Sequence, residues 1–237
     1  MSFLDPSTVQ VDLIGWCFLA VIGIIVPIAA IRAANRTRDV KSESSRRISQ
    51  RLRNVFVLVV LAVAALYVAH RDHIDLFDPV LVTTRFVLVS FGILAGTLLL
   101  AELLLMASSP EERKKLWARQ IIPRHNAERI VWVISSCVAG ATEEIIFRGV
   151  FFVLLAAVTG SIAIASLLSA IVFAIAHYRQ GFRSMAFILG IALLFQWFVI
   201  YSGSLIPAMI VHSLYNIVRG LRASAEPGET EQHLRSS

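Results

Sequence analysis

The sequence predicts an all-α, polytopic transmembrane helix bundle of about seven or eight spans, and three observations lead to this fold class. Of the 237 residues, 57% are hydrophobic and 16% are charged, whereas a soluble domain has about 45–50% apolar and 25% charged residues. The apolar residues form long runs, and the basic residues lie mostly between these runs. The mean hydropathy of +0.74 also argues against an ordinary soluble domain.

Each predicted span is an apolar run long enough, at roughly 17–25 residues, to cross a bilayer as a helix. Helices are expected because a backbone in lipid must pair all of its polar groups within the protein. An eighth span would result if the fourth run were broken. The runs are 13–31, 54–70, 86–107, 130–158, 161–177, 184–200 and 204–219.

The runs divide the chain into three predicted regions. Residues 1–129 form an N-terminal transmembrane region of about three spans, and residues 130–220 form a helical core that carries the candidate functional residues. Residues 221–237 are polar and contain few large apolar residues, so we expect a disordered tail.

The connecting segments predict the orientation of the spans. Residues 32–53 contain eight Lys and Arg against two acidic residues, and residues 108–129 contain six against three. Placing the basic segments in the cytoplasm puts the N-terminus outside and the C-terminus inside. The net charge of +6 therefore reflects topology, and no nucleic-acid partner is expected. The alternative for 32–53 is a surface helix bound to anionic lipid.

The fourth run contains the stretch Gly140–Phe152, in which Glu143, Glu144 and Arg148 stand among apolar residues. A charge in the middle of a bilayer costs at least about 2.5–3.5 kcal/mol, so these residues need a structural or functional reason. Glu144 and Arg148 are four residues apart and can pair on one helix face. Glu143 points about 100° away. It is the candidate general base, because a carboxylate in an apolar pocket can take up a proton near neutral pH.

Two histidines and an asparagine lie in later apolar runs. His177 ends the fifth run, while His212 and Asn216 are four residues apart in the seventh and share a helix face. A single intramembrane histidine is most often a packing residue. Because intramembrane polar groups usually face the interior of the bundle or a water-filled cavity, we expect these three residues and Glu143 to meet in one cavity.

With these residues the chain resembles the CAAX protease and bacteriocin-processing family, also called the CPBP or ABI family. Its members are intramembrane endopeptidases similar to the type II CAAX prenyl endopeptidase. Three motifs carry the resemblance, in the expected order and at separations of about 30 and 35 residues over roughly 130–220. They are Glu-Glu-x-x-x-Arg at Glu143, Glu144 and Arg148, Phe-x-x-x-His at Phe173 and His177, and His-x-x-x-Asn at His212 and Asn216.

The resemblance implies hydrolysis of a peptide bond by water within the membrane. By analogy, Glu143 would activate the water, His177 would orient it, and His212 with Asn216 would stabilise the oxyanion. Glu144 and Arg148 would support these residues. The substrate would be a peptide or a membrane-protein segment, surrounded by membrane lipids, and no cofactor is implied. We expect a bacterial cell membrane from the compact length of the chain and the breadth of the family.

Other interpretations stay open. Two histidines and a carboxylate could bind zinc, but the HExxH pattern is missing and the family analogy favours a metal-independent mechanism. A non-catalytic scaffold or immunity-type protein could keep the fold, and an ion-coupled transporter could use the same residues as a relay. Arg179, Gln180 and Arg183 follow His177; we interpret them as topology charges, with binding of a substrate carboxylate as the alternative.

Overall fold

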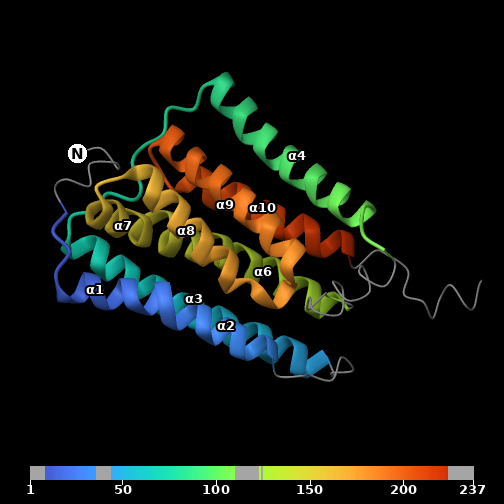
Figure 1. Cartoon of the computed structure of the whole chain (residues 1–237). Coiled ribbons are helices and arrows are strands. Elements are labelled where there is room, and N and C mark those ends of the chain that lie inside the picture. Colours follow the sequence, from blue (N-terminus) through green and yellow to red (C-terminus); the bar gives the residue numbers. More distant parts are fainter. Residues whose placement is uncertain (1–8, 36–43, 110–122, 124, 224–237) are drawn as a thin grey trace, which may run out of the picture.

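The computed structural model of the chain describes residues 9–35, 44–109, 123 and 125–223. Over these residues the protein is helical and contains no strand, only an isolated bridge between Phe77 and Ser204. The predicted all-α class is therefore confirmed. Figure 1 shows the helices running roughly lengthwise in one bundle, with α4 along its upper edge.

In the described parts of the chain, the helical segments join into seven rods where one follows another without a break. A π-helical turn interrupts the first rod, and a longer π-helical segment interrupts the fourth. The rods are α1 (Leu13–Ala20), Val21–Ile25 and α2 (Val26–Asn35); α3 (Ser44–Arg71); α4 (Thr84–Met106); α6 (Asn126–Glu143), Glu144–Phe151 and α7 (Phe152–Thr159); α8 (Ile162–Ala176); α9 (Phe182–Ser202); and α10 (Ile206–Ala223).

Four of these helices are long and apolar enough to cross a membrane: Leu13–Ala34, Ile48–Arg71, Thr84–Met106 and Phe182–Ser202. They support an integral membrane protein. The predicted runs at 130–158, 161–177 and 204–219 fall on α6–α7, α8 and α10, which do not meet the same criterion. α8 has only fifteen residues. α6 contains three charged residues within its eighteen, Glu128, Arg129 and Glu143, and the polar residues of α10 lower its hydropathy. The count of seven or eight spans thus stays a proposal.

Several boundaries differ from the predicted ones. The fourth apolar run is continuous through its π-helical segment, so the structure shows no break in the chain there. α3 begins at Ser44, inside the segment predicted as a loop, because its basic first turns continue directly into an apolar helix. α10 ends at Ala223 and so includes the first residues of the predicted tail; residues 224–237 lie outside the described residues.

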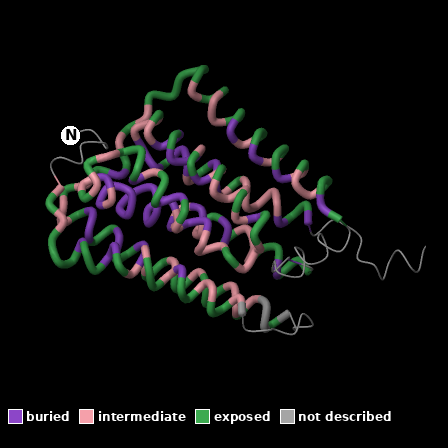
Figure 2. The backbone as a smooth tube through the Cα atoms, in the orientation of Figure 1, coloured by how far each residue is buried: buried purple, intermediate pink, exposed green. Residues whose placement is uncertain are grey.

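The core of the bundle is the π-helical segment and the start of α7, where every residue from Glu144 to Leu154 is buried. Figure 2 shows this buried stretch in the interior, with exposed residues along the outer helices. The outer faces of α3 and α4 are apolar, with Phe56, Leu88 and Phe91 exposed. Apolar outer helices around a core that contains charged residues are what a bilayer favours.

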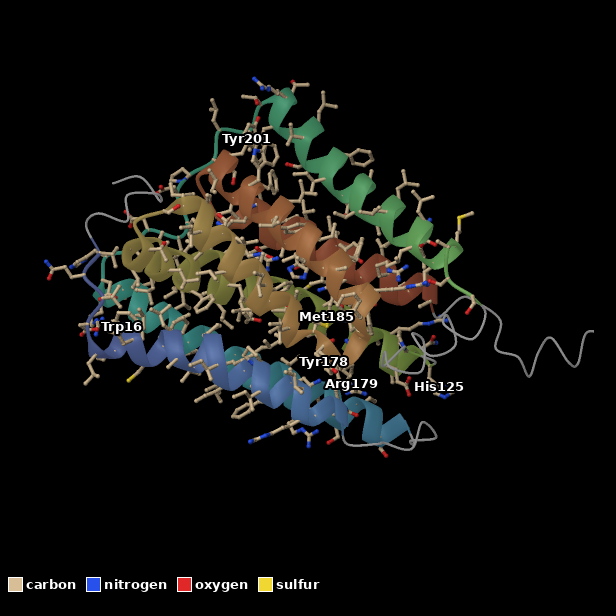
Figure 3. All side chains as sticks on the ribbon, viewed as in Figure 1. Trp16, His125, Tyr178, Arg179, Met185 and Tyr201 are labelled. Carbon is tan, nitrogen blue, oxygen red and sulfur yellow. The ribbon has the colours of Figure 1, made fainter. Side chains whose placement is uncertain are left out.

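The helix ends that flank the two basic segments of the sequence lie at one end of the bundle. Figure 1 shows the end of α2, the start of α3 and the ends of α4 and α10 at the same end. In Figure 3, Tyr178, Arg179 and His125 lie toward that end, while Trp16 and Tyr201 lie toward the other. The alternation of the helices therefore agrees with the distribution of Lys and Arg in the sequence.

Asp12 caps α1 just before the first span and connects it to α3. Its Oδ1 accepts the backbone N–H of Gly15 at 3.0 Å, and its two oxygens accept Arg71 guanidinium bonds at 2.7 Å. The Gly15 N–H, followed by Arg71, holds the pKa of the Asp12 carboxyl below its ordinary value of 3.8. The stabilisation is therefore complete above pH 3.8 and is lost as the pH falls through the lower, folded-state pKa.

We expect Asp12→Asn to lower the thermal unfolding temperature of the detergent-solubilised protein at neutral pH, because Asn cannot pair with Arg71 as an anion. The difference from wild type should shrink on acidification below pH 3.8. Unfolding scans of both proteins across this pH range measure it. A difference that widens in acid would contradict the assignment.

Candidate active site

The residues that the three motifs single out surround one cavity of about 410 Å³. Glu143 is the last residue of α6, His177 follows the end of α8, and His212 and Asn216 lie on α10. All four side chains line the cavity. The structure thus brings together residues that are up to 73 positions apart in the sequence.

The predicted pair of Glu144 and Arg148 forms next to the cavity. Arg148 Nη1 lies 3.2 Å from Glu144 Oε1, and the two side chains are 3% and 0% exposed. The Arg148 guanidinium also lies over the ring of Phe173, 4.0 Å from its centroid. Arg148 lines the cavity and Glu144 lies behind its wall. Glu143, in contrast, points into the cavity, as its different helix face predicts.

His212 connects the two glutamates, which the sequence did not predict. Its Nδ1 lies 2.7 Å from Glu144 Oε1, and its Nε2 lies 3.7 Å from Glu143 Oε2. Since a carboxylate paired with Arg148 acts as an acceptor, Nδ1 carries the proton in the bond to Glu144. That bond fixes the ring, so that Nε2 faces Glu143 and the cavity.

The Phe-x-x-x-His motif has a clear physical basis at the end of α8. His177 Nδ1 lies 2.9 Å from the carbonyl oxygen of Phe173, four residues earlier. A carbonyl only accepts hydrogen bonds, so Nδ1 carries the proton and Nε2 is left as an acceptor. The Phe173 ring packs edge-on against Phe147 with centroids 5.0 Å apart. Phe173 thus holds both His177 and Arg148 in place.

Asn216 is positioned by close packing of α10 on α6. The indole N–H of Trp132 donates to the Asn216 carbonyl at 3.0 Å. Two glycines allow this approach: a Cβ on Gly140 would lie 2.8 Å from the Ser213 nitrogen, and a Cβ on Gly220 would overlap the Trp132 ring. The register of His212 and Asn216 against Glu143 therefore depends on both glycines.

We expect Gly220→Ala to destabilise the protein by about 1–3 kcal/mol, because the added methyl group overpacks the contact with Trp132. Its midpoint of unfolding should fall relative to wild type. Gly190→Ala on α9 is the matched control, since a Cβ there would have no neighbour within 4 Å. Equal midpoints for the two variants would mean that α10 can move away from Trp132 without a loss of stability.

The structure adds cavity residues that the motifs do not contain. Arg179 and Gln180 line the cavity and Arg183 does not. Other polar or aromatic lining residues come from α3, α6, α9 and α10, and their sequence positions gave no signal beyond a charge near the end of an apolar run. They include Arg51, Asn54, Trp132, Ser135, Ser136, Ser184, Phe187, Phe195, Tyr215 and Arg219.

The zinc alternative depends on the side-chain groups that commonly hold a metal ion. Across the described parts of the chain, no group of three or more His, Cys, Asp and Glu side chains is placed to hold a metal ion. His212 Nδ1 is engaged with Glu144, and His177 Nδ1 with a backbone carbonyl. These bonds leave Nε2 of each histidine as the available ligand atom, an arrangement that metal-binding histidines share, so metal independence stays a prediction.

Comparison with known proteins agrees with the three motifs. Residues 125–218 match the family model described as Rce1-like, type II CAAX prenyl endopeptidase Rce1-like. This segment contains Glu143, His177, His212 and Asn216, and the match supports an endopeptidase. No curated protein and no solved structure matches the chain. Over residues 125–218, then, this chain is similar to the Rce1-like type II CAAX prenyl endopeptidases.

Proposed function

We propose that this protein is an intramembrane endopeptidase that hydrolyses a peptide bond with a water molecule activated by Glu143. The observation that carries the proposal is the convergence of Glu143, His177, His212 and Asn216 on one cavity. The cavity holds a candidate base, an acceptor that can orient water, and donors for an oxyanion. No serine or cysteine nucleophile is required.

In the proposed reaction, water sits between the Glu143 carboxylate and Nε2 of His177. Glu143 takes one proton as the water oxygen attacks the carbonyl carbon of the scissile bond. The carbonyl oxygen becomes an oxyanion, which the Asn216 amide stabilises. His212 adds a second donor when its ring carries a proton on Nε2 as well as the one on Nδ1. Glu143 then gives its proton to the leaving nitrogen, and the carbon–nitrogen bond breaks to release an amine and a carboxylic acid.

Glu144 and Arg148 hold this arrangement without touching the substrate. Glu144 accepts the Nδ1–H of His212 at 2.7 Å, and Arg148 balances the charge of Glu144 at 3.2 Å. The three groups are buried together, so their geometry changes little as charge develops in the cavity. Such preorganisation is what stabilises a transition state.

We further propose a multi-pass protein of a bacterial cell membrane, with the N-terminus outside and the C-terminus in the cytoplasm. Residues 1–129 contribute helices that enclose the catalytic core at 130–220. Arg179 and Arg219 line the cavity, which supports a mouth toward the cytoplasm if the positive-inside distribution of Lys and Arg holds. The substrate is a peptide or a membrane-protein segment, taken up from the lipid or the cytoplasm.

The test compares protein termini in host cells that carry wild type or Glu143→Gln at equal abundance in the membrane. We expect new termini only with wild type, and purified protein should reproduce those cleavages. Identical termini in both strains, with purified wild type also inactive on the host membrane proteome, would overturn the proposal. A gradient-dependent ion flux would then favour the transporter.

A further inference from the structure

Two arginines bound the apolar part of α3. Arg53 lies near the start of the helix and Arg71 is its last residue, and the residues between them include no Asp, Glu, Lys or Arg. The two are 18 positions apart, or about 27 Å at 1.5 Å per residue, close to the ~30 Å of the hydrocarbon core. Each arginine therefore lies at a boundary of the bilayer, where its long side chain can reach the headgroups.

The two boundary arginines have different surroundings. Arg71 pairs with the carboxylates of Asp12 and Asp72, each at 2.7 Å. Arg53 is exposed, and none of the described side chains is seen to form an ion pair or a hydrogen bond with it. A guanidinium at a membrane boundary is stabilised by an anion that accepts paired hydrogen bonds. The protein supplies this anion at Arg71, whereas at Arg53 the surroundings would have to supply it.

The helix face around Arg53 suits an amphiphile. Phe56 and Val57, three and four residues later, share the face of Arg53 one turn deeper in the bilayer. Their side chains are 67% and 50% exposed. A phosphate bound at Arg53 would therefore place the attached acyl chains along these apolar side chains. A free phosphate ion could use the arginine but not the apolar face beside it, so the face favours a lipid.

The charge at this end of the bundle favours an anionic lipid over a neutral one. Arg32, near the end of α2, and Arg129, near the start of α6, are also exposed. In Figure 3, His125, which directly precedes α6, lies toward this end. Basic side chains gathered near a membrane surface attract anionic headgroups. Residues 44–53 form the start of α3, so the boundary of a span, and not a separate surface helix, carries the contact.

We propose that Arg53 binds the phosphate of an anionic phospholipid in the leaflet at the basic end of the bundle. The guanidinium takes the headgroup, and Phe56 and Val57 contact the first part of the acyl chains. The phosphate thus has the place at Arg53 that two carboxylates have at Arg71. The inference does not depend on the proposed hydrolysis, because Arg53 does not line the cavity.

Native mass spectrometry of the detergent-solubilised, full-length protein tests the inference. The probes are phosphatidylglycerol, which is anionic, and phosphatidylcholine, which is neutral overall, with identical acyl chains and at equal concentration. We expect the protein to retain phosphatidylglycerol over phosphatidylcholine by about fivefold. Inorganic phosphate added in excess should not displace the bound lipid, because it cannot use the apolar face of Phe56 and Val57.

Substitution of Arg53 gives the decisive comparison. Arg53→Gln should lower the ratio of the two lipids about fivefold, to near one, whereas Arg53→Lys keeps the charge and should retain most of the preference. Arg85→Gln is the matched control. Arg85 is an exposed arginine at the start of α4, but Asp75 and Asp78 precede it in the chain and disfavour an anionic lipid there. This variant should keep the wild-type ratio.

Four results would overturn the inference. Equal retention of the two lipids by wild type would mean that the protein has no preference for an anionic headgroup. A wild-type ratio in Arg53→Gln would assign the preference to other basic side chains. An equal loss in Arg53→Gln and Arg85→Gln would mean that the total charge matters and not one position. Displacement of the lipid by inorganic phosphate would indicate a site for free anions.

Discussion

Replacing Glu143 by Gln is expected to lower the rate of peptide hydrolysis by about 10²–10⁴-fold, the usual contribution of a general base. Gln is nearly the same size, so the cavity keeps its shape and loses only the proton acceptor. Stability should change little, since Glu143 is 3.7 Å from His212 Nε2 and takes no part in the buried pair of Glu144 and Arg148. Initial rates on a cleaved host protein measure the effect.

Cys137→Ser provides the control for this rate measurement. Cys137 lies six residues before Glu143, is exposed and does not line the cavity, so its loss should leave the rate unchanged. A rate that falls with Cys137→Ser and survives Glu143→Gln would indicate a thiol nucleophile. It would contradict the proposed mechanism.

Replacing Glu144 by Gln is expected to destabilise the protein by about 3–5 kcal/mol, because it leaves the Arg148 guanidinium buried without its carboxylate. Hydrolysis should also fall, since the Nδ1–H of His212 loses the anion that orients the ring. The free energy of unfolding in detergent reports the first effect, and rates on the folded fraction report the second.

The double variant Glu144→Gln with Arg148→Met separates the two effects. Removing both charges should recover much of the stability, because replacing a whole buried ion pair by apolar groups is often neutral. Activity should stay low, since His212 still lacks its carboxylate partner. A Glu144→Gln protein as stable as wild type would mean that Arg148 is balanced by another group.

The features that sequence predicted well are local in the chain. The pair of Glu144 with Arg148 and the shared face of His212 and Asn216 both follow from a spacing of four residues in a helix. The motifs predicted which side chains meet in a cavity, and the structure places Glu143, His177, His212 and Asn216 around one. The helical class was also predictable, because it depends on the average hydrophobicity of each segment and not on contacts between segments.

The features that sequence did not predict depend on contacts between distant segments. The bond from His212 to Glu144 joins residues 68 positions apart, and the bond from Arg51 to Ser135 joins residues 84 positions apart. Neither leaves a periodic pattern. The number of spans was also hard to predict, because the polar residues of α6 and α10 lower hydropathy where the helices are most enclosed by protein.

The π-helical segment Glu144–Phe151 has a consequence for how much change in length the site tolerates. Its backbone bonds reach the fifth residue along rather than the fourth, so each residue turns the chain by less than the 100° of an α-helix. The angle between α6, which ends at Glu143, and the buried start of α7 is therefore a function of how many residues lie between them.

A chain that lost one residue here would have two ways to respond. α7 could rotate and lose its present packing. Alternatively, the π-helical segment could become α-helical, which would move Arg148 relative to Glu144. Either response would change the position of Glu143 relative to the buried residues that support it. The number of residues in the Glu144–Phe151 segment is thus as important to the site as their types. An insertion or deletion there is expected to abolish function even when every charged residue is retained.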